Sequence, residues 1–75
     1  MLRRTYWVSP RNGSWAVQLE GGSGAIKICD LKDDAIQRAR ELAHNNQPSQ
    51  VIVQGRDGKI QTEWTYGDDP FPPAG

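Results

Sequence analysis

The sequence predicts a single α+β domain, in which a mainly antiparallel five-stranded sheet carries one helix on one face. Short runs of strand-forming residues precede residue 30 and follow residue 49, and between them apolar residues recur at helical spacing. Two dipeptides typical of hairpin turns, Asn12-Gly13 and Asp57-Gly58, each separate a pair of such runs. The 75 residues, with three Trp, two Tyr and one Phe, suffice for one small core. The predicted order is therefore β-β-β-α-β-β.

The first predicted strand covers residues 4–9, which are rich in β-branched and aromatic side chains. Strand geometry places Tyr6 and Val8 on one face and Trp7 on the other. Asn12-Gly13 follows, and both residue types tolerate the positive φ angles of a tight hairpin turn. The chain is therefore expected to reverse at this dipeptide.

Two further strands are predicted before the helix. Residues 14–20 alternate between polar side chains and an apolar face of Trp15, Val17 and Leu19. A glycine-rich turn at 21–24 leads to residues 25–29, where Ile26 and Ile28 share one face and Ala25, Lys27 and Cys29 share the other. We expect the isoleucine face to pack on the helix.

The helix is expected to begin at Asp30, a good N-cap residue, with Asp33 favouring the same start by attraction to the helix dipole. Asp34 and Arg38 are predicted to form an i,i+4 ion pair. The helix ends at residues 44–46, before Pro48, after about four turns. Its apolar stripe consists of Leu31, Ala35, Ile36, Ala39, Leu42 and Ala43.

Residues 50–54 and 59–64 are predicted as the last two strands, and the Val-Ile-Val run at 51–53 is typical of a strand buried on both faces. The sequence leaves open which edge of the sheet these strands join. Residues 1–66 are expected to form the compact domain and 67–75 a Pro/Gly-rich C-terminal tail. Trp64 belongs either to the core or beneath that tail.

The expected core lies between the helix and one face of the sheet. The other face stays uncovered unless the tail or a second subunit packs on it. The expected core residues are Trp15, Val17, Ile26, Ile28, Leu31, Ala35, Ala39, Leu42, Val51, Val53 and Ile60.

Three segments resemble the bacterial and phage family called domain of unknown function 2188 (DUF2188). They are residues 13–17 (GSWAV), 33–43 (DDAIQRARELA) and 51–61 (VIVQGRDGKIQ), followed by 66–73 (YGDDPFPP). The resemblance covers about residues 6–71 and departs at Asp30, where the family often has Thr. It supports the predicted fold, and it implies no activity because the family's function is unassigned.

The composition argues against several classes of function. Nine basic and nine acidic residues cancel, so no global field attracts nucleic acid or a membrane surface. One cysteine, Cys29, and one histidine, His44, cannot complete a structural zinc site. The acidic pair Asp68-Asp69 supplies too few oxygens for a cation site. With no nucleophile–base pattern and no phosphate loop, we expect no catalytic residues, no cofactor and no metal, and hence not an enzyme.

A small binding or accessory protein that acts through protein contacts is therefore the predicted function, with a homodimer as one form of it. An uncovered sheet face carrying Trp7 and Ile52 would seek a partner. The tail residues Pro70, Phe71 and Pro72 are a candidate contact, either in a partner's groove or folded back over the chain's own open face.

The alternative is a nucleic-acid-binding domain that uses the open sheet face. Trp7 would stack on a base while basic residues contact phosphates. The sheet-and-helix architecture is also similar to sheet-based DNA readers, namely the arm-type domains of tyrosine recombinases and the plant Apetala-type domains. The candidate residues for this surface are Arg3, Arg4, Trp7, Arg11 and Lys27.

We expect a cytoplasmic protein. Residues 1–7 lack the apolar core of a signal peptide, and no apolar run approaches the roughly 20 residues needed to span a bilayer.

Overall fold

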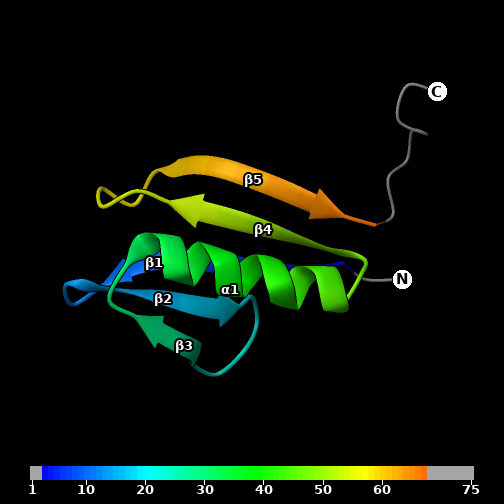
Figure 1. The fold of residues 1–75 in the computed structure, drawn as a ribbon, viewed down its shortest axis with the longest axis horizontal. Helices are drawn as coiled ribbons and strands as arrows, with labels where there is room; N and C mark the ends of the chain where they lie inside the picture. Colours follow the sequence, from blue (N-terminus) through cyan, green and yellow to red (C-terminus); the bar gives the residue numbers. More distant parts are fainter. Residues whose placement is uncertain (1–2, 68–75) are drawn as a thin grey trace.

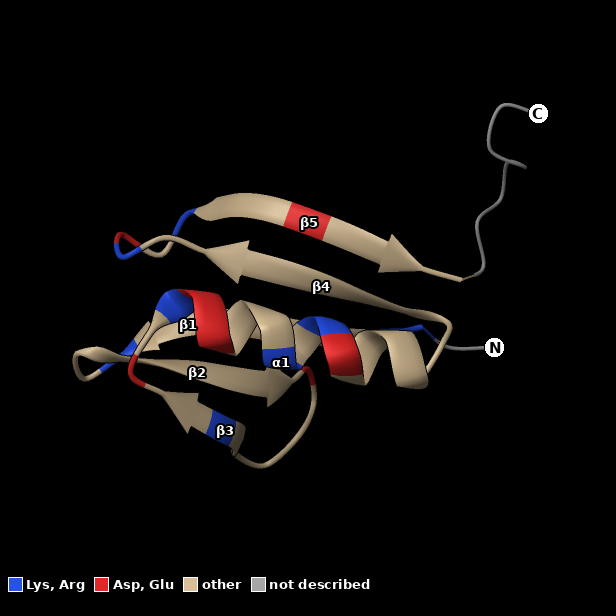
Figure 2. Ribbon diagram, viewed as in Figure 1, with Lys and Arg blue, Asp and Glu red and all other residues tan. Residues whose placement is uncertain are grey.

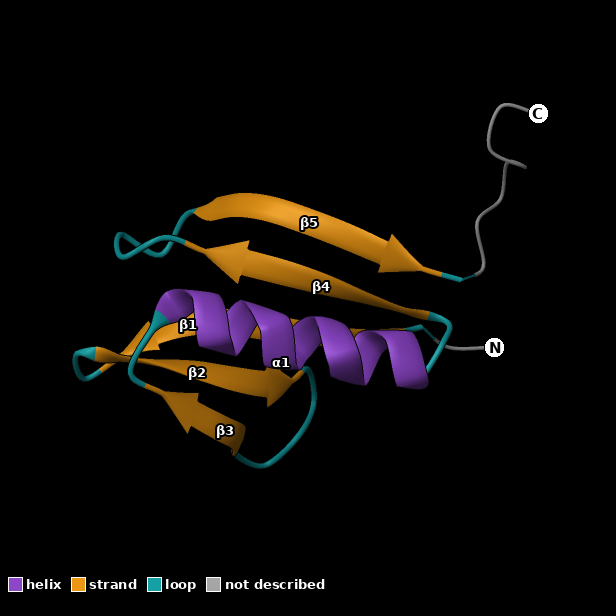
Figure 3. Ribbon diagram, in the orientation of Figure 1, coloured by secondary structure: helices purple, strands orange, loops and turns teal. Residues whose placement is uncertain are grey.

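The computed structural model describes residues 3–67 and confirms one helix on one face of a five-stranded sheet (Figure 1). The sheet is mostly antiparallel, with one parallel pair, β1–β4. Figure 3 shows the two layers, with the helix in front of the sheet. The elements are β1 (Arg4–Arg11), β2 (Ser14–Leu19), β3 (Ala25–Cys29), α1 (Lys32–Asn45), β4 (Ser49–Gln54) and β5 (Ile60–Tyr66).

The strand order β3-β2-β1-β4-β5 answers the question that the sequence left open. β1 lies at the centre, and β4 joins it in parallel after the helix has crossed the sheet. This position places the middle of β4 between two strands and beneath the helix. Val51, Ile52 and Val53 are all buried there, as predicted, although the helix covers only the face that carries Val51 and Val53, and Ile52 lies on the opposite face beside Trp7.

Both predicted hairpin turns are confirmed. Asn12 and Gly13 have φ angles of 50° and 82°, the positive values that the Asn-Gly dipeptide accommodates. At the β4–β5 turn, Gly58 has φ 83° and donates its backbone N–H to the Gly55 carbonyl over 2.9 Å. Asp57 accepts the backbone N–H of Lys59 over 3.0 Å, which is how a short acidic side chain stabilises a turn.

The prediction that Asp30 caps the helix is wrong. The N-cap residue is Leu31, in extended conformation, and no side chain caps the helix there. Asp33 and Asp34 lie in the first turn, so attraction to the dipole remains as the local signal for the start. Arg38 pairs with Glu41 at 3.4 Å and not with Asp34 as the i,i+4 spacing predicted.

Polar contacts at the end of the helix fasten it to the start of β4. The buried Ser49 hydroxyl donates to the Ala43 carbonyl over 2.5 Å, and the Asn46 amide donates to the Leu42 carbonyl over 2.7 Å. These bonds satisfy carbonyls that a helix end leaves without intrahelical partners. Within residues 3–67, no buried side-chain polar atom lacks a hydrogen-bond partner.

The core forms where α1 packs on the central strands β1, β2 and β4. Ala35, Ala39 and Ala43 lie one helical turn apart and are fully buried, so the helix approaches the sheet closely. Leu42 is partly buried at the side of this contact, and Tyr6 and Val8 are core residues that the sequence-based selection omitted. The buried cluster contains Tyr6, Val8, Trp15, Val17, Ala35, Ala39, Ala43, Val51 and Val53.

Four expected core residues are instead exposed: Ile26, Ile28, Leu31 and Ile60. Leu31 precedes the first turn of the helix and projects away from the core, with 62% of its surface exposed. The three isoleucines lie on the edge strands, and their pairing registers turn them away from the helix. A face assigned from apolar alternation alone was therefore wrong for both edges.

Cationic side chains cover two tryptophans on the helix side of the sheet. Lys32 and Arg56 lie 5.0 and 5.6 Å from the centre of the buried Trp15 ring. Arg40 lies 4.4 Å from the centre of the Trp64 ring on β5. Trp64 is half-buried and packs against the core, whereas most of the tail, the other expected neighbour of this ring, lies outside the described residues.

Replacing Trp15 by alanine should lower the free energy of unfolding by about 3–5 kcal/mol, because the ring is buried in the cluster and large-to-small core changes leave a cavity. Urea denaturation monitored by circular dichroism measures this loss. A loss below about 1 kcal/mol would contradict the assignment of this face as the core.

Replacing Ala39 by leucine should destabilise the chain by about 1–3 kcal/mol, because the fully buried methyl group leaves no room for a larger side chain. Gln37→Leu is the matched control, since Gln37 is exposed on the same helix. Equal urea midpoints for the two variants would show that the helix does not approach the sheet as closely as described.

Candidate partner-binding surface

The sheet face opposite the helix is the candidate site, and we call it the outer face. Its members follow from the registers, because directly paired residues share a face. No element among residues 3–67 packs on it, since α1 lies on the opposite side (Figure 1). The outer face includes Trp7, Ser9, Ala16, Gln18, Ile28, Gln50, Ile52, Ile60, Glu63 and Thr65.

Trp7 lies at the middle of this face. It is half-buried and pairs with Gln18 on one side and Ile52 on the other. Its indole N–H donates to the Glu20 carboxylate over 2.9 Å, which holds the ring in one orientation. Ile52 is only 7% exposed, so it contributes little surface of its own beside Trp7.

Strand β3 has an inverted distribution of polar and apolar side chains. Lys27 pairs with the buried Val17 and Cys29 pairs with Trp15, so both side chains are on the helix side. Ile28 pairs with Ala16 on the outer face and is 50% exposed. Ile26 lies at the irregularity in the β2–β3 pairing and is 45% exposed. Apolar surface is thus presented to solvent at the edge of the sheet.

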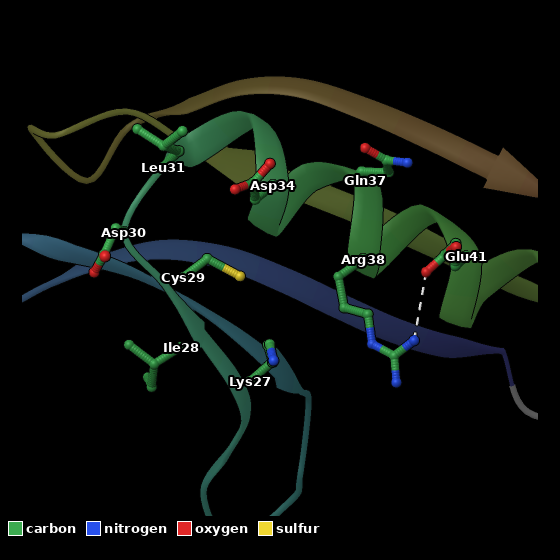
Figure 4. A pocket seen from close by; sticks show the side chains of 9 residues that line it. All are labelled: Lys27, Ile28, Cys29, Asp30, Leu31, Asp34, Gln37, Arg38 and Glu41. Carbon is green, nitrogen blue, oxygen red and sulfur yellow. Dashed lines mark hydrogen bonds and ion pairs between the residues drawn. The ribbon is translucent and has the colours of Figure 1, made fainter.

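An open groove of about 640 Å³ runs between β3 and α1, on the other side of the same edge (Figure 4). Lys27 and Cys29 line it from the strand, and Asp34, Arg38 and Glu41 line it from the helix. Arg38 and Glu41 form the ion pair described above, whereas the side chains of Lys27 and Asp34 form no hydrogen bond or ion pair with any of residues 3–67. With Asp30, which also lines the groove, its walls carry two positive and three negative side chains.

The structure separates the five residues predicted to bind nucleic acid. Trp7 is on the outer face, and Arg11 ends β1 on the same face. Arg4 is on the helix side, where its guanidinium donates to the Asn46 carbonyl over 3.5 Å, and Arg3 is exposed just before β1. Lys27 is in the groove, so the prediction that it points to the open face is wrong.

Charged residues lie mostly at the ends of the sheet and along the helix, apart from Lys27 within β3 and Glu63 in the middle of β5 (Figure 2). Strands β2 and β4, which make up much of the outer face, contain no charged residue. Three basic side chains, Lys32, Arg40 and Arg56, lie over tryptophan rings on the helix side and not on the outer face. The outer face therefore lacks the basic stripe that a phosphate-tracking surface requires.

The remaining candidates are placed as follows. His44 is exposed in the last turn of α1, with its ring 6.2 Å from that of Tyr66 in an edge-on arrangement. Cys29 is a free, half-buried thiol. Pro70, Phe71 and Pro72, together with Asp68-Asp69, lie outside the described residues. Residues 3–67 bring together no group of three or more His, Cys, Asp or Glu side chains suited to a metal ion.

No helix in the part of the chain that the structure describes combines the length and apolar character needed to cross a membrane.

Sequence reasoning missed Ile26 and Ile28 as surface residues because they fit the apolar pattern of a core strand. The sequence carries no local signal for the correct assignment, because the face of β3 depends on its register with β2, which pairs Ile28 with Ala16 on the outer face.

Comparison with known proteins agrees with the resemblance found in the sequence. Residues 6–66 match the model of a family described as "Uncharacterized protein conserved in bacteria (DUF2188)". A relative from Bacillus subtilis (strain 168), described as "Uncharacterized protein YdaT", is 34% identical over 67 residues. That match covers 89% of this chain and 44% of the relative, so the chain spans less than half the length of that protein. No solved structure matches the chain.

Replacing Ile28 by threonine should change the free energy of unfolding by less than about 1 kcal/mol, because the side chain is half exposed. Val53→Thr is the matched control: it buries a hydroxyl group in the core and should cost about 1–3 kcal/mol. If Ile28→Thr proves as costly as Val53→Thr in urea denaturation, β3 faces the helix with its isoleucines and the described register is incorrect.

Proposed function

The chain belongs to the DUF2188 family, which has no assigned function, and we propose that it is a non-enzymatic protein-binding module whose outer face is the contact surface. The observation that carries this proposal is the inverted strand β3, which turns Ile26 and Ile28 away from the core. Strands of a two-layer domain normally turn their apolar side chains toward the core, and departures from such consistent patterning are expected at functional sites.

Burial of these side chains by a partner supplies a driving force. Ile26 and Ile28 are each about half exposed, so covering both removes about as much apolar surface from water as burying one whole isoleucine. That burial contributes roughly 1.5–3 kcal/mol to the free energy of binding. Trp7 adds a half-buried aromatic ring held in place by Glu20. A rigid aromatic residue loses little conformational entropy on binding, so it is well suited to be the anchor of an interface.

The surroundings of Trp7 also suit a protein partner. Gln18, Gln50 and Thr65 are uncharged hydrogen-bonding residues on the same face. Protein interfaces commonly combine an apolar centre with such a polar rim, and charged residues are depleted at their centres. The lack of charged residues in β2 and β4 matches that composition.

Nucleic-acid binding has less support. Of the five residues proposed for it, Arg4 and Lys27 are on the helix side of the sheet. The Trp7 ring lies beside the Glu20 carboxylate, whose charge repels a phosphate group. Cations that do approach tryptophan rings, such as Arg40 on Trp64, lie on the helix side of the sheet.

Titration of fluorescently labelled mixed-sequence DNA and RNA with the purified chain tests the two classes against each other. We expect no binding that weakens steeply between low and moderate salt, since the outer face presents no set of phosphate contacts. Salt-sensitive binding that disappears when Arg3, Arg4 and Trp7 are replaced together would establish the nucleic-acid function and overturn the proposal.

Affinity capture from a bacterial lysate supplies the complementary result. Protein partners retained by the wild-type chain should resist moderate salt and be lost from the Trp7→Thr variant. They should be kept by Gln37→Thr, a change of an exposed helix residue on the other side of the molecule. Partners that bind all three proteins equally would exclude the outer face as the contact surface.

A further inference from the structure

Strand β3 is an edge strand, and among residues 3–67 it pairs only with β2. Its outward-facing backbone groups are therefore available to another strand. Ile26 and Ile28 are about half exposed along this edge. The β3–α1 groove, which Ile28 also borders, opens beside it (Figure 4). Any strand that pairs here would contact both the isoleucines and the groove.

The five residues of β3 read almost the same in both directions. Small residues, Ala25 and Cys29, are at the ends, isoleucines stand next to them, and Lys27 is at the centre. A contact between identical copies related by a two-fold axis requires a self-complementary surface, and an antiparallel strand with this symmetry meets that requirement.

We propose that β3 pairs antiparallel with β3 of a second copy of this chain, about a two-fold axis at Lys27, so that one sheet runs through both copies. The inference deepens the proposed function by naming a partner and rests on the same exposed isoleucines. It uses the edge of the sheet and leaves the Trp7 region of the outer face free.

We call the contact between the two paired β3 strands the seam. Its apolar side consists of two equivalent pairs of isoleucines. With Lys27 on the axis, Ile26 lies opposite the second copy's Ile28, and Ile28 lies opposite the second copy's Ile26. Directly opposed side chains have Cβ atoms about 4.5–5.5 Å apart, close enough for the branched chains to pack together. The seam therefore covers both isoleucines that are exposed in the single chain.

The opposite side of the seam places two Lys27 side chains together, and a lysine on an edge strand normally discourages pairing. Here the groove supplies compensating charge. Lys27 and Arg38 carry two positive charges in each copy, and Asp30, Asp34 and Glu41 carry three negative ones. Since the Asp34 carboxylate has no ion-pair partner among residues 3–67, it is available to neutralise a lysine at the seam.

The other edge strand, β5, is poorly suited to the same pairing. Glu63 is the central residue of Ile60–Tyr66, so two-fold pairing about it would set two carboxylates opposite each other. Its paired neighbour on β4 is Ile52, and no basic residue is paired with it. Like charges directly opposite each other destabilise a strand pair, which leaves β3 as the self-complementary edge.

Sedimentation equilibrium of the purified chain tests the proposal first. A seam of five residues is small by the standard of stable interfaces, so we expect a weak dimer, observable at roughly 0.1–1 mM chain. Ile28→Lys should weaken dimerisation at least tenfold. Ile60→Lys is the matched control, because Ile60 is also on the outer face and is 53% exposed, but it lies on β5. It should leave the dimer unchanged.

Oxidative cross-linking then tests the register and does not depend on the folding of Ile28→Lys. In the Lys27→Cys/Cys29→Ser variant the two introduced thiols meet on the axis, so mild oxidation should yield a covalent dimer. The control, Lys59→Cys/Cys29→Ser, places an exposed thiol in the β4–β5 turn and should stay mostly monomeric.

A chain that is monomeric over this concentration range would overturn the proposal. So would a dimer that persists in Ile28→Lys and fails to cross-link at position 27. Neither result affects the lysate capture, which depends on Trp7 and reports on the outer face separately. A dimer abolished by Trp7→Thr but unchanged by Ile28→Lys would place the second copy on the outer face and likewise reject the β3 seam.

Discussion

The close approach of α1 to the sheet is the contact on which the rest of the structure depends. Ala35, Ala39 and Ala43 lie on one ridge of the helix and are fully buried. Because their side chains are single methyl groups, the helix backbone lies near the valines of the central strands beneath it. The core of this small domain is thus made of short side chains, and its two large buried rings, Tyr6 and Trp15, belong to the sheet.

A helix so close to the sheet leaves the tryptophan rings beside it to be covered by longer side chains. Lys32 and Arg56 extend over Trp15, and Arg40 extends over Trp64. A cation over an aromatic face gains electrostatic stabilisation while its aliphatic stem covers apolar surface. This arrangement also explains why basic residues do not gather on the outer face: several of them complete the helix side of the core.

The same geometry explains the inversion of β3. The helix packs chiefly on β1, β2 and β4, so the edge strand β3 is only partly covered. A lysine can project into the shallow groove there with its ammonium group in solvent, which a central strand would not permit. The isoleucines of β3 then fall on the outer face, where they join Trp7 and Ile52 as apolar surface. The proposed contact surface and the proposed edge seam therefore both depend on the position of this helix.

The sequence by itself determined the elements and their order. Asn12-Gly13 and Gly58 located the two hairpins because few residues accept positive φ, and the alanine spacing identified the buried ridge of the helix. The sequence also identified Trp7 as an outer-face residue, because β1 lies at the centre of the sheet and alternates without interruption. Local conformational preferences act over a few residues, so they can be read from a few residues.

Only the tertiary structure decided the faces of the edge strands and the location of the basic residues. Ile28 and Lys27 exchange faces relative to the apolar pattern because the face of β3 is set by its register with β2 and by the irregularity at Ile26. Arg4 shares the helix side with Tyr6 and Val8, and only the tertiary structure places its guanidinium beside the Asn46 carbonyl at the end of α1. Register and such long-range contacts depend on pairing energies between distant segments, and no local pattern in the chain encodes them.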